Sequence, residues 1–272
     1  MSFEAIGKHN PKYNRSLVIT NLADATSTTI PAVKSMQVPT RSGSWAAYLL
    51  APDPDAKKTT PALGSTLVLL NLETGKERRF SYVTEYQFAR DAGTLVYAVS
   101  SPKKRKNGVY AYTPGDRGWS RALIRKKTRF FKLTWNHAQT QLAFLSEAEK
   151  RYPKEETPLR LLLWNRAAQK AATISQSNWN AQSLGMRLSE NGPLRFTRDD
   201  RKLIISVAPP QLKPTTKSSD PAEIVVADIW SGHDGLIQQR QTVLASREKK
   251  RSYAGLYDLH SKHYTQIADL KV

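Results

Sequence analysis

The sequence predicts an all-β protein, a β-propeller built from four-stranded antiparallel blades. Short apolar strands separated by polar turns recur along the chain, and an equivalent apolar residue returns at a regular interval. The equivalent residues are Trp45, Leu95, Leu142 and Leu203, at steps of 50, 47 and 61 residues. Repeats of about 40–50 residues are typical of propeller blades, because one blade cannot bury both faces alone and must pack against its neighbours.

Two kinds of segment make up the repeat. One is an apolar strand followed by a polar turn, as in residues 67–76 and 161–165. The other is a strand, a polar turn and a strongly apolar strand, found at residues 36–50, 86–100, 132–146 and 195–206. A parallel α/β sheet would need amphipathic helices between the strands, and a β-sandwich would not explain the long period. The propeller is therefore the fold that the pattern favours.

The expected organisation is a leader or orphan strand over residues 1–16 and a partial propeller over residues 17–272. We expect blades at residues 17–54, 67–103, 108–147, 160–210 and 224–272. The fifth begins with a strand at residues 224–230 and resumes, after a polar excursion, as a hairpin from residue 253. The Pro-, Lys- and Ser-rich residues 209–221 are predicted to form a loop. Four or five blades make a small ring with no evident closing strand, so we expect an incomplete propeller, or a crowded small ring, belonging to something longer.

The composition narrows the classes of function. The chain has 272 residues, a formal net charge of +19 and no cysteine. The lack of cysteine excludes disulfides, thiolate metal sites and cysteine nucleophiles. No apolar run approaches the ~18 residues of a membrane-spanning helix, and the first residues lack the apolar stretch of a signal peptide. We therefore expect no membrane span.

The positive charge gathers in three clusters between apolar strands, at residues 103–106, 125–129 and 247–251. Asn107-Gly108 follows the first cluster and predicts a tight hairpin turn. We interpret the clusters as solvated turns that protect sheet edges, because no helix-turn-helix, zinc-finger or RRM motif accompanies them. A basic propeller that binds nucleic acid remains an alternative, and its affinity would fall steeply with salt.

No constellation of catalytic residues stands out in the sequence. Gly43-Ser44-Trp45 and Gly64-Ser65-Thr66 lack the Gly-x-Ser-x-Gly pattern of a nucleophile elbow and are predicted to be turns. The string Glu73-Thr-Gly75-Lys76 resembles the end of a phosphate-binding loop, but without an upstream glycine and a following helix it predicts a hairpin turn.

The histidines and paired carboxylates also point to turns. His260 and His263 have the spacing of a metal pair, but they straddle a predicted hairpin turn with no third ligand nearby in sequence. Asp199-Asp200 is predicted to serve a turn rather than acid–base catalysis. The remaining histidines, His9, His137 and His233, are scattered. The sequence thus predicts no catalytic, cofactor-binding or metal-binding residues, and no cofactor.

The order of these segments resembles the N-terminal β-propeller of the prolyl oligopeptidase family of serine peptidases, in the bacterial branch related to dipeptidyl- and acylaminoacyl-peptidases. Residues 82–101 are similar to that branch's Glu-Tyr-x-Phe-x-x-Asp-Gly-x-x-Leu-x-Tyr segment. The other matching segments are Leu67–Lys76, Gly108–Tyr112, Leu133–Ser146, Gly192–Leu203, Asp228–Trp230, Leu236–Gln241, Arg247–Tyr253 and Tyr257–Leu259. The likeness covers about residues 17–270.

The resemblance implies a role rather than a reaction. In that family the propeller caps a C-terminal α/β-hydrolase domain and screens peptide substrates, and the catalytic triad belongs to the hydrolase. This chain matches none of the triad motifs, so the resemblance implies a non-catalytic, substrate-gating domain, periplasmic or secreted in its parent, with a peptide substrate and a hydrolase domain as partners. A free-standing binding scaffold of the Tol-system type is the alternative. Open blade edges would also favour self-association.

Overall fold

The computed structural model describes residues 15–52, 62–115, 118–148, 157–174, 179, 185–210, 240, 244, 247–248 and 250–268. The predicted strand at residues 224–230, nearly all of the predicted leader and most of the predicted loop at 209–221 lie outside these residues. The chain divides into two compact units, one formed by residues 1–147 and 161–174 and the other by residues 148–160 and 175–272. Each unit is described by itself.

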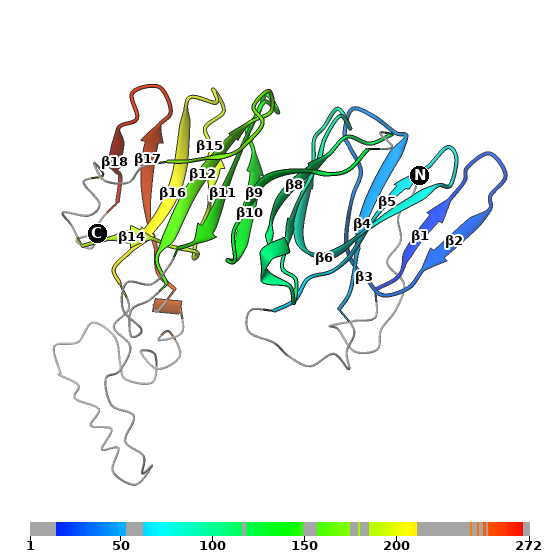
Figure 1. Cartoon of the computed structure of the whole chain (residues 1–272), viewed down its shortest axis with the longest axis horizontal. Coiled ribbons are helices and arrows are strands. Elements are labelled where there is room, and N and C mark those ends of the chain that lie inside the picture. Colours follow the sequence, from blue (N-terminus) through cyan, green and yellow to red (C-terminus); the bar gives the residue numbers. More distant parts are fainter. Residues whose placement is uncertain are drawn as a thin grey trace, which may run out of the picture. The chain divides into compact units, whose positions relative to one another are not determined.

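The first unit contains a hairpin and two larger antiparallel sheets (Figure 1). β1 (Leu17–Thr20) pairs with β2 (Ser27–Ile30). The strands of the larger sheets follow one another in chain order. A seven-stranded sheet contains β3 (Val33–Gln37), β4 (Trp45–Leu50), β5 (Ser65–Asn71), β6 (Glu77–Phe88), β7 (Leu95–Val99), β8 (Gly108–Tyr112) and β9 (Arg121–Arg125). A four-stranded sheet contains β10 (Phe130–Trp135), β11 (Gln141–Glu147), β12 (Leu159–Asn165) and β13 (Ala172–Thr173).

The seven-stranded sheet consists of two blades that share the long strand β6. The first half of β6 pairs with β5, and the second half, from Val83 onward, pairs with β7. Between the halves Tyr82 has a φ of +62°, and the register shifts on both sides. A bulge of this kind bends a strand and increases its twist. The first blade is therefore β3–β5 with the start of β6, and the second is the end of β6 with β7–β9.

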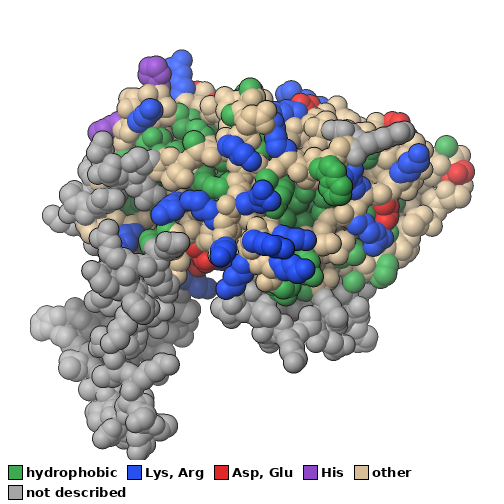
Figure 2. Space-filling view, in the orientation of Figure 1, with side chains coloured by type: hydrophobic (Ala, Val, Ile, Leu, Met, Phe, Trp, Pro, Cys, Tyr) green, Lys and Arg blue, Asp and Glu red, His purple; other side chains and the backbone are tan. Residues whose placement is uncertain are grey.

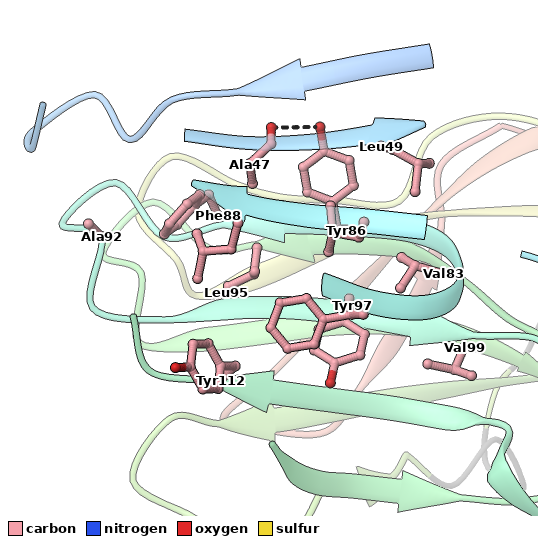
Figure 3. Packing of buried hydrophobic residues seen from close by; sticks show 13 residues of the cluster. Ala47, Leu49, Val83, Tyr86, Phe88, Ala92, Leu95, Tyr97, Val99 and Tyr112 are labelled. Atoms are coloured by element: carbon pink, nitrogen blue, oxygen red, sulfur yellow. Dashed lines mark hydrogen bonds between the residues drawn. The ribbon is translucent and has the colours of Figure 1, made fainter. Parts of the chain in front are cut away.

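Both faces of the second blade are buried, as a propeller requires. Successive residues of a strand point to opposite faces, and every residue of β7 is buried. Leu95, Tyr97 and Val99 pack with the first blade in a cluster that also holds Phe88 (Figure 3). Val96 and Ala98 face the other way and pack with residues of β10, β11 and β12. The apolar run of β7 thus reflects a sheet held between two others.

The β1–β2 hairpin covers the other face of the first blade. Leu17 of β1 forms a cluster with Val33, Tyr48 and Val68, and Ile19 and Ile30 pack against it. The first unit therefore stacks a hairpin and three four-stranded blades.

The second unit contains a further antiparallel sheet. Its strands are β14 (Arg187–Leu188), β15 (Arg195–Phe196), β16 (Lys202–Ala208), β17 (Tyr253–Asp258) and β18 (Tyr264–Gln266). β14 and β15 both pair with β16, and β17 and β18 follow. The buried Trp179 stacks on Tyr264 at 4.7 Å between ring centroids and contacts Tyr257.

The structure confirms the predicted fold class, an all-β propeller of four-stranded antiparallel blades. Trp45, Leu95 and Leu142 lie at the start of the second strand of a blade, and Leu203 lies at the start of β16, next to β14 and β15. The sheets, however, group the strands differently from the predicted blades. β4 and β5, which the sequence predicts to lie in separate blades, pair with each other. β17 pairs with β16, so residues 253–266 belong to the fourth sheet.

The Asn107-Gly108 prediction is wrong in its geometry. The connection from β7 to β8 contains a 3₁₀ helix at Lys104–Lys106, and Gly108 already lies in β8. Asn107 is buried, and its side-chain oxygen accepts a hydrogen bond from the Ser101 N–H at 2.8 Å. Gly108 is required for another reason: a Cβ there would lie 2.3 Å from the carbonyl oxygen of Ile124 on β9.

Candidate binding pocket at three bulged strands

A pocket of about 460 Å³ opens in the first unit where the first strands of its three blades begin. We call it the bulge pocket. Its walls come from β3, β6 and β10, from the loop that leads into β5, and from the end of β11. The lining residues used below are Lys34, Leu63, Gly64, Glu85, Arg129 and Glu147. The volume lies within the ~300–1,000 Å³ that is typical of ligand sites.

Each of the three first strands is bulged at the pocket. The register of β3 shifts between Val33 and Ser35, that of β6 between Val83 and Glu85, and that of β10 between Phe131 and Thr134. Ala32, Tyr82 and Lys132, at or beside these bulges, all have φ between +54° and +62°. Bulges are common next to binding sites because they redirect side chains and leave backbone groups unpaired. At β10 the bulge frees two backbone N–H groups for a side chain of the neighbouring blade.

The bulge of β10 is held by a carboxylate from β6. The two oxygens of Glu85 accept hydrogen bonds from the backbone N–H groups of Lys132 and Leu133, at 2.7 and 2.8 Å. We call this pair of bonds the Glu85 clasp. Burial raises the pKa of Glu85 above its ordinary value, although both backbone hydrogen bonds and the charge of Lys132 act to lower it. A partly buried carboxylate thus joins the second blade to the third in the pocket wall.

A neutral counterpart joins the first blade to the second. The side-chain oxygen of Gln37 on β3 accepts a hydrogen bond from the Phe88 N–H at 2.9 Å, and its amide nitrogen donates to the Tyr86 carbonyl oxygen at 3.4 Å. We call this pair of bonds the Gln37 clasp. Beside it the Tyr86 hydroxyl donates to the Ala47 carbonyl oxygen at 3.3 Å (Figure 3), and burial raises the pKa of Tyr86 to about 12.

An ion pair forms another part of the wall. The Arg129 Nε lies 2.9 Å from the Glu147 Oε1, and the Arg129 guanidinium lies 4.3 Å from the centre of the Phe131 ring. Phe130 and Phe131 supply apolar surface beside these charges. The pocket therefore combines apolar walls with both signs of charge.

The loop that leads into β5 approaches β6 closely at the pocket. A Cβ on Gly64 would lie 2.1 Å from the Tyr82 carbonyl oxygen, so only glycine fits there. The Gly64 N–H donates to the carbonyl oxygen of Ser100, and the Ser100 hydroxyl donates to that of Ala62. These bonds fix this wall to the end of β7.

The serines considered from the sequence take part in local structure. The Ser44 hydroxyl donates to Glu73 at 2.6 Å, and the Ser65 hydroxyl donates to the Leu50 carbonyl oxygen at 2.6 Å. Ser65 does line the bulge pocket. In the turn after β5, the Asn71 side chain accepts from the N–H groups of Glu73 and Thr74, and Gly75 has a φ of +67°.

The histidines and the carboxylate pair lie in turns as well. His260 and His263 are exposed between β17 and β18, and His137 is exposed between β10 and β11. Asp199 accepts from the Thr197 hydroxyl and from the Arg201 N–H in the turn before β16. His9 and His233 lie outside the described residues. Within the described ranges, no three His, Asp or Glu residues are grouped as a metal site, and no helix is long and apolar enough to cross a membrane.

The sequence did not identify the residues of the bulge pocket. Glu85 falls inside the Glu-Tyr-x-Phe segment used for the family resemblance. The sequence feature that could have identified it is a carboxylate within a strand of otherwise half-buried residues. Lys34 and Arg129 carry no such signal, because the bulges that bring them to the pocket are not visible in a pattern of apolar residues.

Solved structures of low sequence identity share this fold. An oligogalacturonate lyase in complex with manganese matches over 96% of this chain and 61% of its own, with a TM-score of 0.50 and 9% identity. A prolyl endopeptidase matches over 95% of this chain and 33% of its own, with a TM-score of 0.50 and 8% identity. An acylaminoacyl peptidase of Pyrococcus horikoshii matches with a TM-score of 0.47 and 10% identity, over 94% of this chain and 35% of its own.

These likenesses show the fold alone. Propeller domains of prolyl oligopeptidase-family peptidases are among the structural neighbours, in agreement with the resemblance drawn from the sequence. The chain spans less than two thirds of the first two proteins. No protein-family model and no curated protein sequence matches it.

Proposed function

We propose that this chain is a non-catalytic propeller that binds peptide segments at the bulge pocket and thereby controls which peptides reach a hydrolase. The observation that carries the proposal is the pocket itself, which lies where the first strands of three successive blades begin. Its apolar rings suit peptide side chains, and its charged groups offer hydrogen-bond partners to a peptide main chain.

The structural likeness supports the peptidase context. The prolyl endopeptidase that matches is one in which inter-domain dynamics have a role in catalysis and specificity. A propeller that binds part of a peptide would contribute to specificity without supplying a reactive group. The Tol-type scaffold and the nucleic-acid-binding propeller remain alternatives to this proposal.

The test is peptide binding by the full chain with and without a blocked pocket. Leu63 lines the pocket and its side chain is partly exposed, so Leu63→Trp places a large ring at the mouth. Leu22 is 72% exposed in the turn between β1 and β2, which makes Leu22→Trp a matched control. Binding of fluorescent peptides, followed by anisotropy, should weaken at least about tenfold for Leu63→Trp and stay unchanged for Leu22→Trp.

Two outcomes would contradict the proposal. The first is equal peptide binding by the two tryptophan variants, which would place the binding surface elsewhere. The second is cleavage of the bound peptide, detected by mass spectrometry, by a protein sample that still cleaves after repeated purification.

A further inference from the structure

Two basic loops lie close in sequence to residues that form the walls of the bulge pocket. We define them as residues 103–106, between β7 and β8, and residues 125–127, at the end of β9 and the start of the connection to β10. The first loop follows Ser100, which is hydrogen-bonded to Ala62 and Gly64 in the pocket wall. The second leads into Arg129 and Phe130, which line the pocket. Both loops are therefore fixed to the pocket by short stretches of chain.

The second loop contacts the two residues that directly follow the first loop. Arg125 is paired with Gly108 in the β8–β9 register, and the Lys126 N–H donates to the Asn107 carbonyl oxygen at 3.3 Å. The two loops thus lie next to each other and carry seven cationic side chains, all of them exposed. Between residues 93 and 146 the sequence contains a single acidic residue, Asp116. Lys and Arg clearly outnumber Asp and Glu on the face of the molecule shown in Figure 2.

The charges of the basic loops are not neutralised within the part of the chain that the structure describes. The ion pairs found there join Glu77 with Arg79, Glu147 with Arg129, Asp91 with Arg166 and Glu248 with Arg251. None involves residues 103–106 or 125–127. Clustered, unneutralised cations raise the local potential and attract ligands of opposite charge.

We propose that the bulge pocket takes acidic peptides, which the basic loops attract to its mouth. This inference rests on the proposed function, since it names the class of peptide that the pocket would accept. Electrostatic attraction of this kind acts mainly on the rate of association and weakens as salt is added.

The pocket favours an acidic peptide over a nucleic acid. Glu85 and Glu147 lie in its walls. A nucleic acid carries a phosphate at every nucleotide, and these phosphates would be repelled by the two carboxylates. A peptide carries its acidic groups at intervals, and its backbone N–H groups can donate to those carboxylates. Tyr110, on β8 just after the first loop, is stacked on Tyr97 and donates its hydroxyl to the Lys106 carbonyl oxygen. It is therefore already engaged rather than held ready to stack on a base.

The experiment compares three peptides of equal length, rich in Glu, Gln or Lys, together with a single-stranded oligothymidylate. Each is titrated into the full chain and into a variant with Lys103→Gln, Lys104→Gln, Arg105→Gln and Lys106→Gln. The matched control loses four exposed cations of the second unit through Arg187→Gln, Arg195→Gln, Arg198→Gln and Lys262→Gln. Both variants have the same net charge, so a difference between them reports the position of the charges.

We expect the Glu-rich peptide to bind at least about ten times more tightly than the Gln-rich peptide at low salt. The advantage should shrink as salt rises from about 50 to 200 mM. The loop variant should lose most of this advantage and bind the Gln-rich peptide as before, whereas the control variant should change less than about twofold.

The outcomes separate this inference from the proposed function. If the Glu-rich and Gln-rich peptides bind equally, or if the two variants behave alike, the inference is wrong and peptide binding stands. If no peptide binds, both fail. If the oligothymidylate binds more tightly than the Glu-rich peptide and Leu63→Trp does not weaken it, the basic loops serve nucleic acid and the inference is overturned.

Discussion

The Gln37 clasp and the Glu85 clasp both join neighbouring blades, one through a neutral amide and the other through a carboxylate. Each side chain comes from the first strand of one blade and makes two hydrogen bonds to the backbone of the first strand of the next. The amide of Gln37 offers one donor and one acceptor, whereas the carboxylate of Glu85 offers two acceptors. The difference arises from the partner: β6 presents a carbonyl and an N–H to Gln37, but the bulge of β10 presents two consecutive N–H groups to Glu85.

This difference also separates a purely structural contact from one at the pocket. Glu85 lines the bulge pocket, and Gln37 is absent from its walls. The two clasps therefore allow a direct comparison between a neutral and an ionisable link in one unit.

The largest effect is expected when the carboxylate is removed. Glu85→Ala leaves the N–H groups of Lys132 and Leu133 without this acceptor, and Leu133 is buried. An unsatisfied buried donor costs about 1–3 kcal/mol, so the free energy of unfolding should fall by about 2–4 kcal/mol. Gln37→Ala should lower it by about 1–2 kcal/mol, because one of its two bonds is long at 3.4 Å.

Urea denaturation of both variants measures this ranking. A larger loss for Gln37→Ala than for Glu85→Ala would show that the carboxylate is not the stronger link. Far-UV circular dichroism of each variant before denaturation provides the control that the β-structure is retained.

The second prediction concerns pH. The pKa of Glu85 is raised above its ordinary value of 4.5, so the folded protein holds this proton more tightly than the unfolded chain does. The stability that this shift contributes is fully present below the unfolded pKa and is lost as pH rises through the folded pKa. In Glu85→Gln the side chain does not titrate. The difference in unfolding free energy, wild type minus Glu85→Gln, should therefore decrease as pH rises from about 4 to 7.

Gln37→Ala serves as the control for this measurement. The wild type and this variant share all titrating groups, so their difference should stay constant over the same pH range. A constant difference for Glu85→Gln as well would show that the folded pKa of Glu85 is not raised.

The fold was predictable because its strongest signal is buried apolar alternation. Residues such as Leu95 and Leu142 recur since each blade needs an apolar second strand covered on both faces. Blade boundaries were not predictable from turns. The step from the first blade to the second occurs within the continuous strand β6, whereas β4 and β5 of one blade are separated by residues 51–64. In this part of the chain the long gap therefore lies inside a blade, and the boundary between two blades has no gap at all.

The candidate site was less predictable for a related reason. The bulge pocket depends on a one-residue shift in each of three strands, and such shifts leave the apolar pattern almost unchanged. Lys132 at positive φ shows the difficulty, because nothing in its residue type demands that conformation. The basic loops, in contrast, were visible in the sequence, but the contact between Lys126 and Asn107 required the structure.

The smallest effect is expected at an ion pair that links the same two blades as the Glu85 clasp. Arg166, in the turn after β12, contacts Asp91, in the turn after β6, with 2.9 Å between Nη1 and Oδ2. Although slight desolvation raises the pKa of Asp91, the hydrogen bonds from Arg166 and the Gly93 N–H hold it below its usual value. The Asp91 side chain is 51% exposed, so water and salt screen the pair.

Asp91→Asn should therefore lower the free energy of unfolding by only about 0.2–1 kcal/mol at low salt, and by less at high salt. Because the folded pKa of Asp91 is lowered, its contribution should be present above the unfolded pKa and lost as pH falls through the folded pKa, opposite in sign to that of Glu85. Urea denaturation measures both effects, at two salt concentrations and at pH values from above the unfolded pKa of Asp91 to below its folded pKa. We expect the Glu85 clasp to be the stronger link because its hydrogen bonds are buried, not merely because it is charged. If Asp91→Asn lowered the free energy of unfolding as much as Glu85→Ala does, and salt did not change this loss, that explanation would be wrong.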